Sequence, residues 1–118
     1  MSSSCEGGAP EVLQIDPGNP SRPAVRRAAE VLRSGGVAVF PTDTLYGLGC
    51  SAHSGRGLER LRRLKGGART SPFILLLADP AWVGSIAASV PPAAKNLMER
   101  YWPGPLTIVL AACTFIRQ

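Results

Sequence analysis

The spacing of apolar residues changes several times along the chain, and each change predicts a new secondary-structure element. A first helix is predicted to begin after Ser21, with Pro23 in its first turn, and to end at the glycines of residues 35–36. Two short apolar runs follow, "VAVF" at residues 37–40 and "LYGLGCS" at residues 45–51, and each predicts a strand. The helical spacing is carried by Val25, Ala28, Ala29 and Leu32.

The second half of the chain continues this alternation. Leucines at three-residue spacing mark one face of a helix over residues 55–65, whose other face is rich in arginine. The run "FILLL", residues 73–77, predicts a buried strand, and residues 79–89 predict a helix whose first residue, an aspartate, caps it. A further helix, residues 93–102, precedes the turn "PGP" and a strand at residues 106–112.

Strands and helices that alternate with short connections predict an α/β layered domain. Residues 1–20 are rich in serine, glycine and turn-forming residues, and we expect a flexible segment there, ahead of a domain over residues 21–118. The chain stops soon after its last predicted strand with no closing element. This pattern predicts an incomplete domain, the N-terminal part of a larger one.

Composition narrows the class of protein. The chain has 118 residues, of which 45% are hydrophobic, enough for one modest core. Its formal net charge of +5 favours anionic partners such as nucleotide phosphates or RNA. The three widely spaced cysteines give neither a disulfide framework nor a paired metal motif, and no metal site is predicted. The sequence shows neither a secretory signal nor an apolar run long enough to cross a membrane, so we expect a cytoplasmic protein without a membrane partner.

A polar break interrupts the apolar pattern between the first two predicted strands. The stretch "PTDT", residues 41–44, follows the end of a strand, where ligands gather in open α/β sheets. Thr42 and Thr44 offer hydroxyls that donate and accept hydrogen bonds, and Asp43 offers an acceptor. The same residue types also make ordinary turns through bonds from side chain to backbone, so the pattern by itself leaves both interpretations open.

Three stretches of the chain together resemble the threonylcarbamoyl-AMP synthase, or YrdC-like, family. They are "GGVAVFPTDTLYGLGCSA", "RLRRLKGGARTSPFILLL" and "YWPGPLTIVL", in the order of the family's motifs and at about its spacing. The resemblance implies a twisted mixed sheet with helices around a positively charged cavity. It also implies a nucleotidyltransferase that combines ATP, L-threonine and bicarbonate, with magnesium, to give threonylcarbamoyl-AMP and pyrophosphate. The product would pass to the t6A transfer machinery for the t6A37 modification of tRNA.

The resemblance assigns roles to individual residues. Thr44 matches the family's threonine that contacts the amino-acid substrate, and Thr42 and Tyr46 would shape the same pocket. Lys65 matches the lysine of the family's KxR motif, which implies a catalytic residue facing the phosphates of ATP. A lysine in the last turn of a helix also interacts favourably with the helix dipole, so a purely structural role for Lys65 is an equal alternative.

Two further residues, Ser71 and Thr107, match positions that contact or approach ATP. The "WPGP" stretch ahead of Thr107 is equally suited to a tight turn packed by Trp102. The chain departs from the family pattern at Gly67, where the KxR motif has its arginine, and Arg69 is the candidate that would reach the same phosphates. The family's later SxN motif has no counterpart in the sequence, and no P-loop is present.

Two other functions stay open at this point. A non-catalytic RNA-binding module would hold tRNA or double-stranded RNA through phosphate contacts, although no aromatic stacking platform is evident. An inactive truncated fragment would bind neither substrate nor RNA. Pyrophosphate release that depends on threonine and bicarbonate distinguishes the enzyme from both alternatives.

Overall fold

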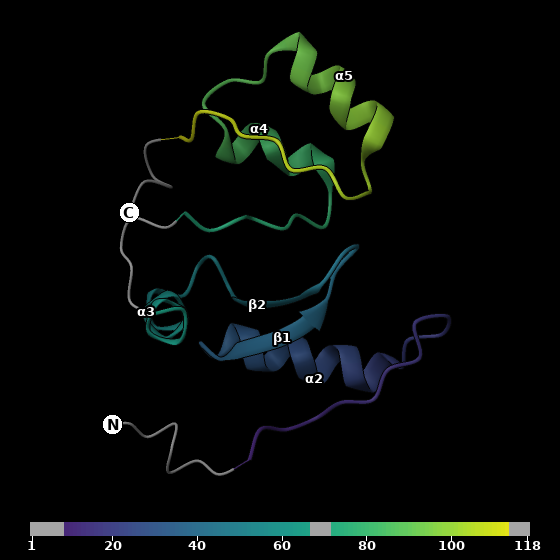
Figure 1. Cartoon of the computed structure of the whole chain (residues 1–118), viewed down its shortest axis with the longest axis vertical. Helices are drawn as coiled ribbons and strands as arrows, with labels where there is room; N and C mark the ends of the chain where they lie inside the picture. Colours follow the sequence, from purple (N-terminus) through teal and green to yellow (C-terminus); the bar gives the residue numbers. More distant parts are fainter. Residues whose placement is uncertain (1–8, 67–71, 114–118) are drawn as a thin grey trace. The chain divides into compact units, whose positions relative to one another are not determined.

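The computed structural model describes residues 9–66 and 72–113, and Figure 1 shows the elements of this part of the chain. They are, in chain order, helix α2 (Arg22–Arg33), strands β1 (Val37–Pro41) and β2 (Tyr46–Cys50), helix α3 (Gly55–Leu64), the 3-10 helix η1 (Pro80–Trp82), and helices α4 (Val83–Ile86) and α5 (Pro92–Tyr101). The described residues fall into two compact units. The first combines the chain up to Ala38 with Leu48–Leu61, and the second combines Val39–Gly47 with the chain from Arg62 onward.

The two helices expected in the first half of the chain are confirmed. Helix α2 has Pro23 in its first turn, as predicted, although the Ser21 side chain makes no capping hydrogen bond. Gly35 and Gly66 follow α2 and α3 with φ angles of 87° and 97°. Glycine adopts this left-handed conformation without a steric penalty, which explains why each helix ends beside a glycine.

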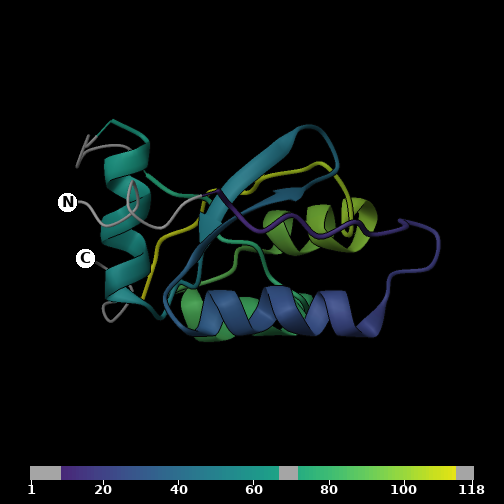
Figure 2. The same cartoon turned by 90° about the horizontal axis from the view of Figure 1, so that it is seen from below.

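The two strands predicted around the polar break are also confirmed. Strands β1 and β2 pair to form a two-stranded sheet, seen from two directions in Figures 1 and 2. Only residues 42–45 connect them, so the pair is antiparallel, because parallel strands need a crossover of about a dozen or more residues. The hairpin therefore presents the PTDT stretch as its turn.

The apolar core lies in the second unit. Four buried residues, Val83, Ala87, Ala94 and Met98, form one cluster. We call it the α4–α5 cluster, because α4 supplies Val83 and the residue after α4 is Ala87. Helix α5 supplies the other two at a spacing of four residues, which places them on one helix face. Partly buried side chains complete it: Leu77, Val90, Trp102, Ile108 and Leu110.

The strands predicted at residues 73–77 and 106–112 are not formed, so that prediction is wrong. Ile74, at 69% exposure, and Val109, at 92%, lie in solvent. Residues 106–110 alternate between half-buried and exposed, as in a strand. Within the described residues, however, the segment 106–112 pairs only through an isolated antiparallel bridge between Ala87 and Ala112. An apolar run favours extended backbone, whereas a strand also requires hydrogen bonds from a neighbouring strand.

The helix predicted at residues 79–89 is shorter than expected. Its start is confirmed, since the Asp79 carboxylate accepts the Ala81 N–H at 2.9 Å. It ends at Ile86, where Ala87 turns to extended backbone, and the next N–H, of Ala88, donates to the Ala111 carbonyl at 2.7 Å. The tertiary bridge thus ends the helix where local propensity would have continued it. The α/β class is confirmed, with a single hairpin as its sheet in the described residues.

Candidate functional site

The PTDT loop is closed by a threonine side chain. The Thr42 hydroxyl donates to the carbonyl of Leu45, and its oxygen accepts the backbone N–H of Thr44 at 3.3 Å. Gly47 lies opposite: a Cβ at this position would sit 3.4 Å from the Thr42 methyl group and 3.6 Å from the Phe40 ring. Thr42 therefore acts inside the loop, as the turn interpretation of this stretch expects.

Other side chains of the loop remain open to solvent. Thr44 and Asp43 are exposed, and no partner for the Thr44 hydroxyl is found among the described residues. Tyr46, the first residue of β2, is 76% exposed. With Thr42 occupied by the turn, Thr44 is the loop hydroxyl left available for an external ligand.

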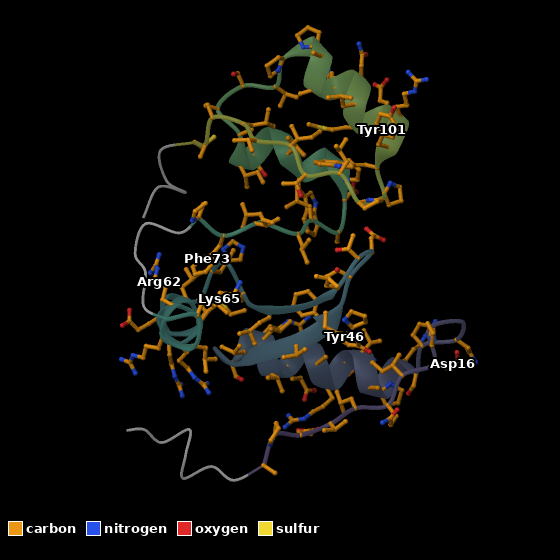
Figure 3. The ribbon with its side chains drawn as sticks, viewed as in Figure 1. Asp16, Tyr46, Arg62, Lys65, Phe73 and Tyr101 are labelled. Atoms are coloured by element: carbon orange, nitrogen blue, oxygen red, sulfur yellow. The ribbon has the colours of Figure 1, made fainter. Side chains whose placement is uncertain are left out.

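Lys65 directly follows α3 and carries an exposed ammonium. Its Nζ lies 5.7 Å from the centre of the Phe73 ring, and Cζ of Arg62 lies 5.6 Å from the same centre. Both distances are within the range of cation–π attraction. Figure 3 shows the three side chains gathered at the end of α3. We call them the Phe73 cluster.

Sequence reasoning identified Lys65 in this cluster and missed its two companions. Arg62 precedes Lys65 by three residues, a spacing that places side chains on one helix face, so this neighbour was detectable. Phe73 follows Lys65 by eight residues and begins the "FILLL" run. That run predicted only an apolar strand, so nothing in the sequence near Phe73 indicated a contact with the two cations.

Thr107 is exposed in the segment that follows α5. The Trp102 indole N–H donates to the Leu106 carbonyl at 2.8 Å, and Trp102 packs against the α4–α5 cluster. The structure thus supports the tight turn packed by Trp102, with Thr107 on its solvent side. Arg69 and Ser71, and with them Gly67, lie outside the described residues.

The sequence-predicted site residues that the structure describes belong to one compact unit. Thr42, Thr44 and Tyr46 are in the stretch Val39–Gly47, and Lys65 and Thr107 are in the chain from Arg62 onward. Two hollows of the described surface lie elsewhere, along α2, and their lining includes none of these residues. Open, arginine-lined hollows of this kind on an exposed helix do not resemble the mostly apolar pockets that bury small ligands.

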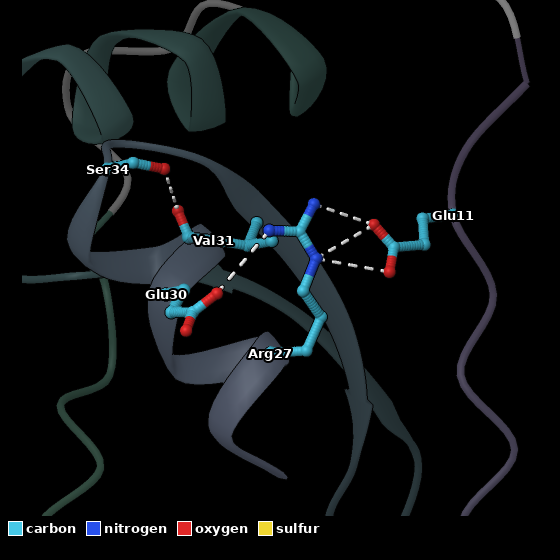
Figure 4. Close-up of polar contacts among 5 residues, drawn as sticks. All are labelled: Glu11, Arg27, Glu30, Val31 and Ser34. Carbon is cyan, nitrogen blue, oxygen red and sulfur yellow. Dashed lines mark hydrogen bonds and ion pairs between the residues drawn. The ribbon is translucent and has the colours of Figure 1, made fainter. Parts of the chain in front are cut away.

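Helix α2 also carries an ion pair, between Arg27 and Glu11 (Figure 4). Arg27 Nη2 and Nε donate to Oε1 of Glu11 at 2.9 and 3.1 Å, and Nη1 lies 3.7 Å from Glu30. The hydrogen bond from Arg27 lowers the pKa of Glu11, and the same bond raises the pKa of Arg27. This pair attaches the N-terminal arm to α2 and contains no predicted site residue.

Metal binding and membrane crossing each require a particular feature of the described residues. They contain no group of three or more histidine, cysteine, aspartate or glutamate side chains placed to hold a metal ion. None of their helices combines the length and apolarity that crossing a membrane requires.

Comparison with known proteins extends over most of the chain. The threonylcarbamoyl-AMP synthase of Bacillus subtilis (strain 168) is 38% identical over 88 residues, which cover 75% of this chain and 25% of that protein. The structure of P. abyssi Sua5 complexed with L-threonine superposes with a TM-score of 0.78 at 34% identity, covering 81% of this chain and 28% of the other. The structure of E. coli YciO superposes with a TM-score of 0.72 at 31% identity, covering 82% of this chain and 47% of the other.

The chain therefore spans between about a quarter and a half of the proteins that it resembles. A family model described as "Telomere recombination", that of Sua5, YciO and YrdC, matches residues 30–117. This match includes the PTDT loop, Lys65 and Thr107. The chain belongs to the Sua5/YciO/YrdC family.

Proposed function

We propose that this chain carries the threonine-binding loop and part of the triphosphate-binding surface of a threonylcarbamoyl-AMP synthase. The observation that carries the proposal is the likeness, over 81% of the chain, to a Sua5 structure solved with L-threonine. The PTDT loop supports it, because the loop holds one threonine in a turn and leaves the Thr44 hydroxyl free. In this function Thr44 contacts the substrate threonine, and Thr42 and Tyr46 shape its pocket.

The chemistry explains why such a site needs hydroxyls and positive charge. The amine of threonine takes up carbon dioxide, supplied by bicarbonate, as a carbamate. A carbamate oxygen then attacks the α-phosphate of ATP, and pyrophosphate leaves. Because two anions must meet, the main tasks of the protein are placement and charge stabilisation. Lys65, with its exposed ammonium, supplies charge to the phosphates, and Ser71, Arg69 and Thr107 are the further proposed ATP contacts.

Magnesium would enter this reaction with the ATP. Magnesium commonly keeps several waters and binds substrate phosphates with one or two carboxylates, so it does not require a protein cage. The donor set of the described residues agrees with this mode, since no cluster of three metal-binding side chains occurs there. Asp43, exposed on the PTDT loop, is the carboxylate nearest in sequence to the proposed substrate contacts.

The product would be used by the t6A transfer machinery to modify tRNA, a cytoplasmic role. A second candidate function, RNA binding without catalysis, is favoured by a stripe of arginines on α2. Arg22, Arg26 and Arg33 recur at helical spacing on an exposed face, and the described residues provide no ion-pair partner for them. Retention of tRNA that weakens with salt, in the absence of threonine-dependent turnover, would support this second function.

Titration calorimetry of the chain with L-threonine and with ATP tests the first function. Thr44→Val keeps the shape of the side chain but removes the hydroxyl, so threonine affinity should fall about fivefold, on the order of 1 kcal/mol, with ATP affinity unchanged. Thr44→Ser keeps the hydroxyl and serves as the matched control. Equal threonine affinity in Thr44→Val and the unaltered chain would reduce Thr44 to a turn residue. Pyrophosphate release dependent on threonine and bicarbonate is the corresponding activity assay.

A further inference from the structure

Two cations share one aromatic ring in the Phe73 cluster. The charge centres of Arg62 and Lys65 lie 5.6 and 5.7 Å from the centre of the Phe73 ring, so their separation cannot exceed the sum of these distances. Arg62 and Phe73 are half-buried, whereas Lys65 is exposed. Both positive groups thus contact the same ring at the end of α3 (Figure 3).

No carboxylate of the described residues neutralises either cation. Among the described residues, Arg62 and Lys65 form no ion pair with a carboxylate. Like charges three residues apart on a helix repel each other, so the arrangement is unfavourable until an anion joins it. Two cations that share one aromatic ring, with no acidic partner in the part of the chain that the structure describes, are suited to bind an anion.

The end of α3 explains why both groups point to one side. Arg62 and Lys65 are three residues apart, which places them on the same face of a helical turn. Gly66, with a φ of 97°, then ends the helix, and its N–H donates to the carbonyl of Arg63 at 3.2 Å. This closed turn restricts where the Lys65 backbone lies, and the Phe73 ring restricts the directions of the two long side chains.

We propose that Arg62 is a second phosphate-binding cation of this chain and that Phe73 is a positioning residue that holds it beside Lys65. The inference rests on the proposed function for the role of Lys65, and it extends that role to two residues to which the resemblance assigns none. It also accounts for the glycine at position 67, where the resemblance implies an arginine. Arg62, three positions before Lys65, then supplies a positive charge in addition to the contact proposed for Arg69.

The arrangement fits a chain of phosphates better than a single carboxylate. Arginine presents a planar fork of donors that can contact two oxygens at once, while lysine acts as a compact charge. A triphosphate carries anionic oxygens on adjacent phosphorus atoms, so each cation can bind a different phosphate. The ligand class is therefore a nucleoside triphosphate or inorganic triphosphate.

Calorimetry with inorganic triphosphate, a probe that lacks the nucleoside, tests the proposal on the unaltered 118-residue chain and its variants. Arg62→Gln should lower triphosphate affinity roughly tenfold, since it removes a charge-assisted contact. Arg60→Gln is the matched control, because Arg60 is also half-buried on α3 and carries the same charge, but points about 200° away around the helix. Its affinity should stay within about twofold of the unaltered chain.

Two substitutions at Phe73 test the positioning role separately. Phe73→Leu should weaken triphosphate binding about threefold, in line with the loss of an exposed cation–π contact, and Phe73→Tyr, which keeps the ring, should restore it. L-Threonine affinity should stay unchanged in both variants, an outcome that general unfolding would not produce. Equal triphosphate affinity in Phe73→Leu and Phe73→Tyr would overturn the role of the ring.

Lys65→Gln separates this proposal from the proposed function. Loss of triphosphate binding in Lys65→Gln, with no difference between Arg62→Gln and Arg60→Gln, would retain Lys65 as a phosphate contact and overturn the role of Arg62. Loss of binding in Arg62→Gln alone would support Arg62 and contradict the proposed role of Lys65. An unaltered chain that binds no triphosphate would overturn the inference, whereas absent threonine binding would count against the proposed function only.

Discussion

The PTDT loop and the α4–α5 cluster belong to the same compact unit, yet different forces determine their conformations. In the cluster, Met98 is only 8% exposed and packs among other apolar side chains. In the loop, Tyr46 is 76% exposed, and the turn depends on the hydrogen bonds of the Thr42 hydroxyl. Burial of apolar surface dominates stability, whereas exposed polar groups contribute little to it and remain available to ligands.

We therefore expect stability and ligand binding to be separable in this chain. Substitutions in the cluster should change the free energy of unfolding and leave the affinity of the folded chain for ligands alone. Substitutions in the loop should change the affinity for ligands and leave the free energy of unfolding nearly unchanged.

Met98→Ala should lower the free energy of unfolding by about 2–3 kcal/mol, because it removes buried methylenes and leaves a cavity among Val83, Ala87 and Ala94. Urea denaturation followed by circular dichroism measures the change. Under conditions where the variant is folded, its affinity for L-threonine should stay within about twofold of the unaltered chain. A large loss of threonine affinity in folded Met98→Ala would show that cluster and loop are coupled.

Leu97→Ala is the matched control on the same helix. Leu97 is 41% exposed and lies outside the cluster, so its truncation should cost less than about 1 kcal/mol. Similar losses for Leu97 and Met98 would mean that α5 does not bury one face against the cluster.

Thr42→Val should disorder the PTDT loop without destabilising the fold. The variant keeps the shape of the side chain but loses both hydrogen bonds that close the turn, a change on the order of 1 kcal/mol within the loop. We expect a changed amide shift of Thr44 in NMR spectra and, if the proposed function holds, threonine affinity about fivefold lower. Thr42→Ser retains the hydroxyl and should behave like the unaltered chain.

The smallest predicted effect concerns the exposed pair of Glu11 and Arg27. Its hydrogen bond lowers the pKa of Glu11 in the folded chain, so the stability from this pair is present above the ordinary glutamate pKa and is lost as the pH falls through the lowered value. An NMR titration of the Glu11 carboxyl should show its pKa rising toward the ordinary value in Arg27→Gln. In Arg26→Gln, a charge-matched control on the same helix, the Glu11 pKa should not move.

Part of the fold was predictable from local pattern. The helices ending before Gly35 and Gly66, the cap at Asp79 and the turn at residues 42–45 each follow from neighbouring residues in the sequence. The strands predicted at residues 73–77 and 106–112 were not predictable in the same way. Their hydrophobicity is a local property, but strand formation depends on hydrogen-bonding partners from elsewhere in the chain.

The candidate site was likewise predictable only in part. Thr42 and Thr44 are found by their position in a polar break, and Lys65 by its motif, because each signal lies within a few residues. Which threonine closes the turn, and which one is left free, depends on the geometry of the hairpin.

Sequence by itself thus determined the helices, the polar loop, the basic character and the family, since all of these follow from residue type and short-range spacing. Tertiary structure alone decided that helix α4 ends at the bridge to Ala112, and that Phe73 meets Arg62 and Lys65. Both depend on the folded backbone bringing together groups that are farther apart than helix or strand spacing reaches, and a local pattern does not encode which such partner a group will contact.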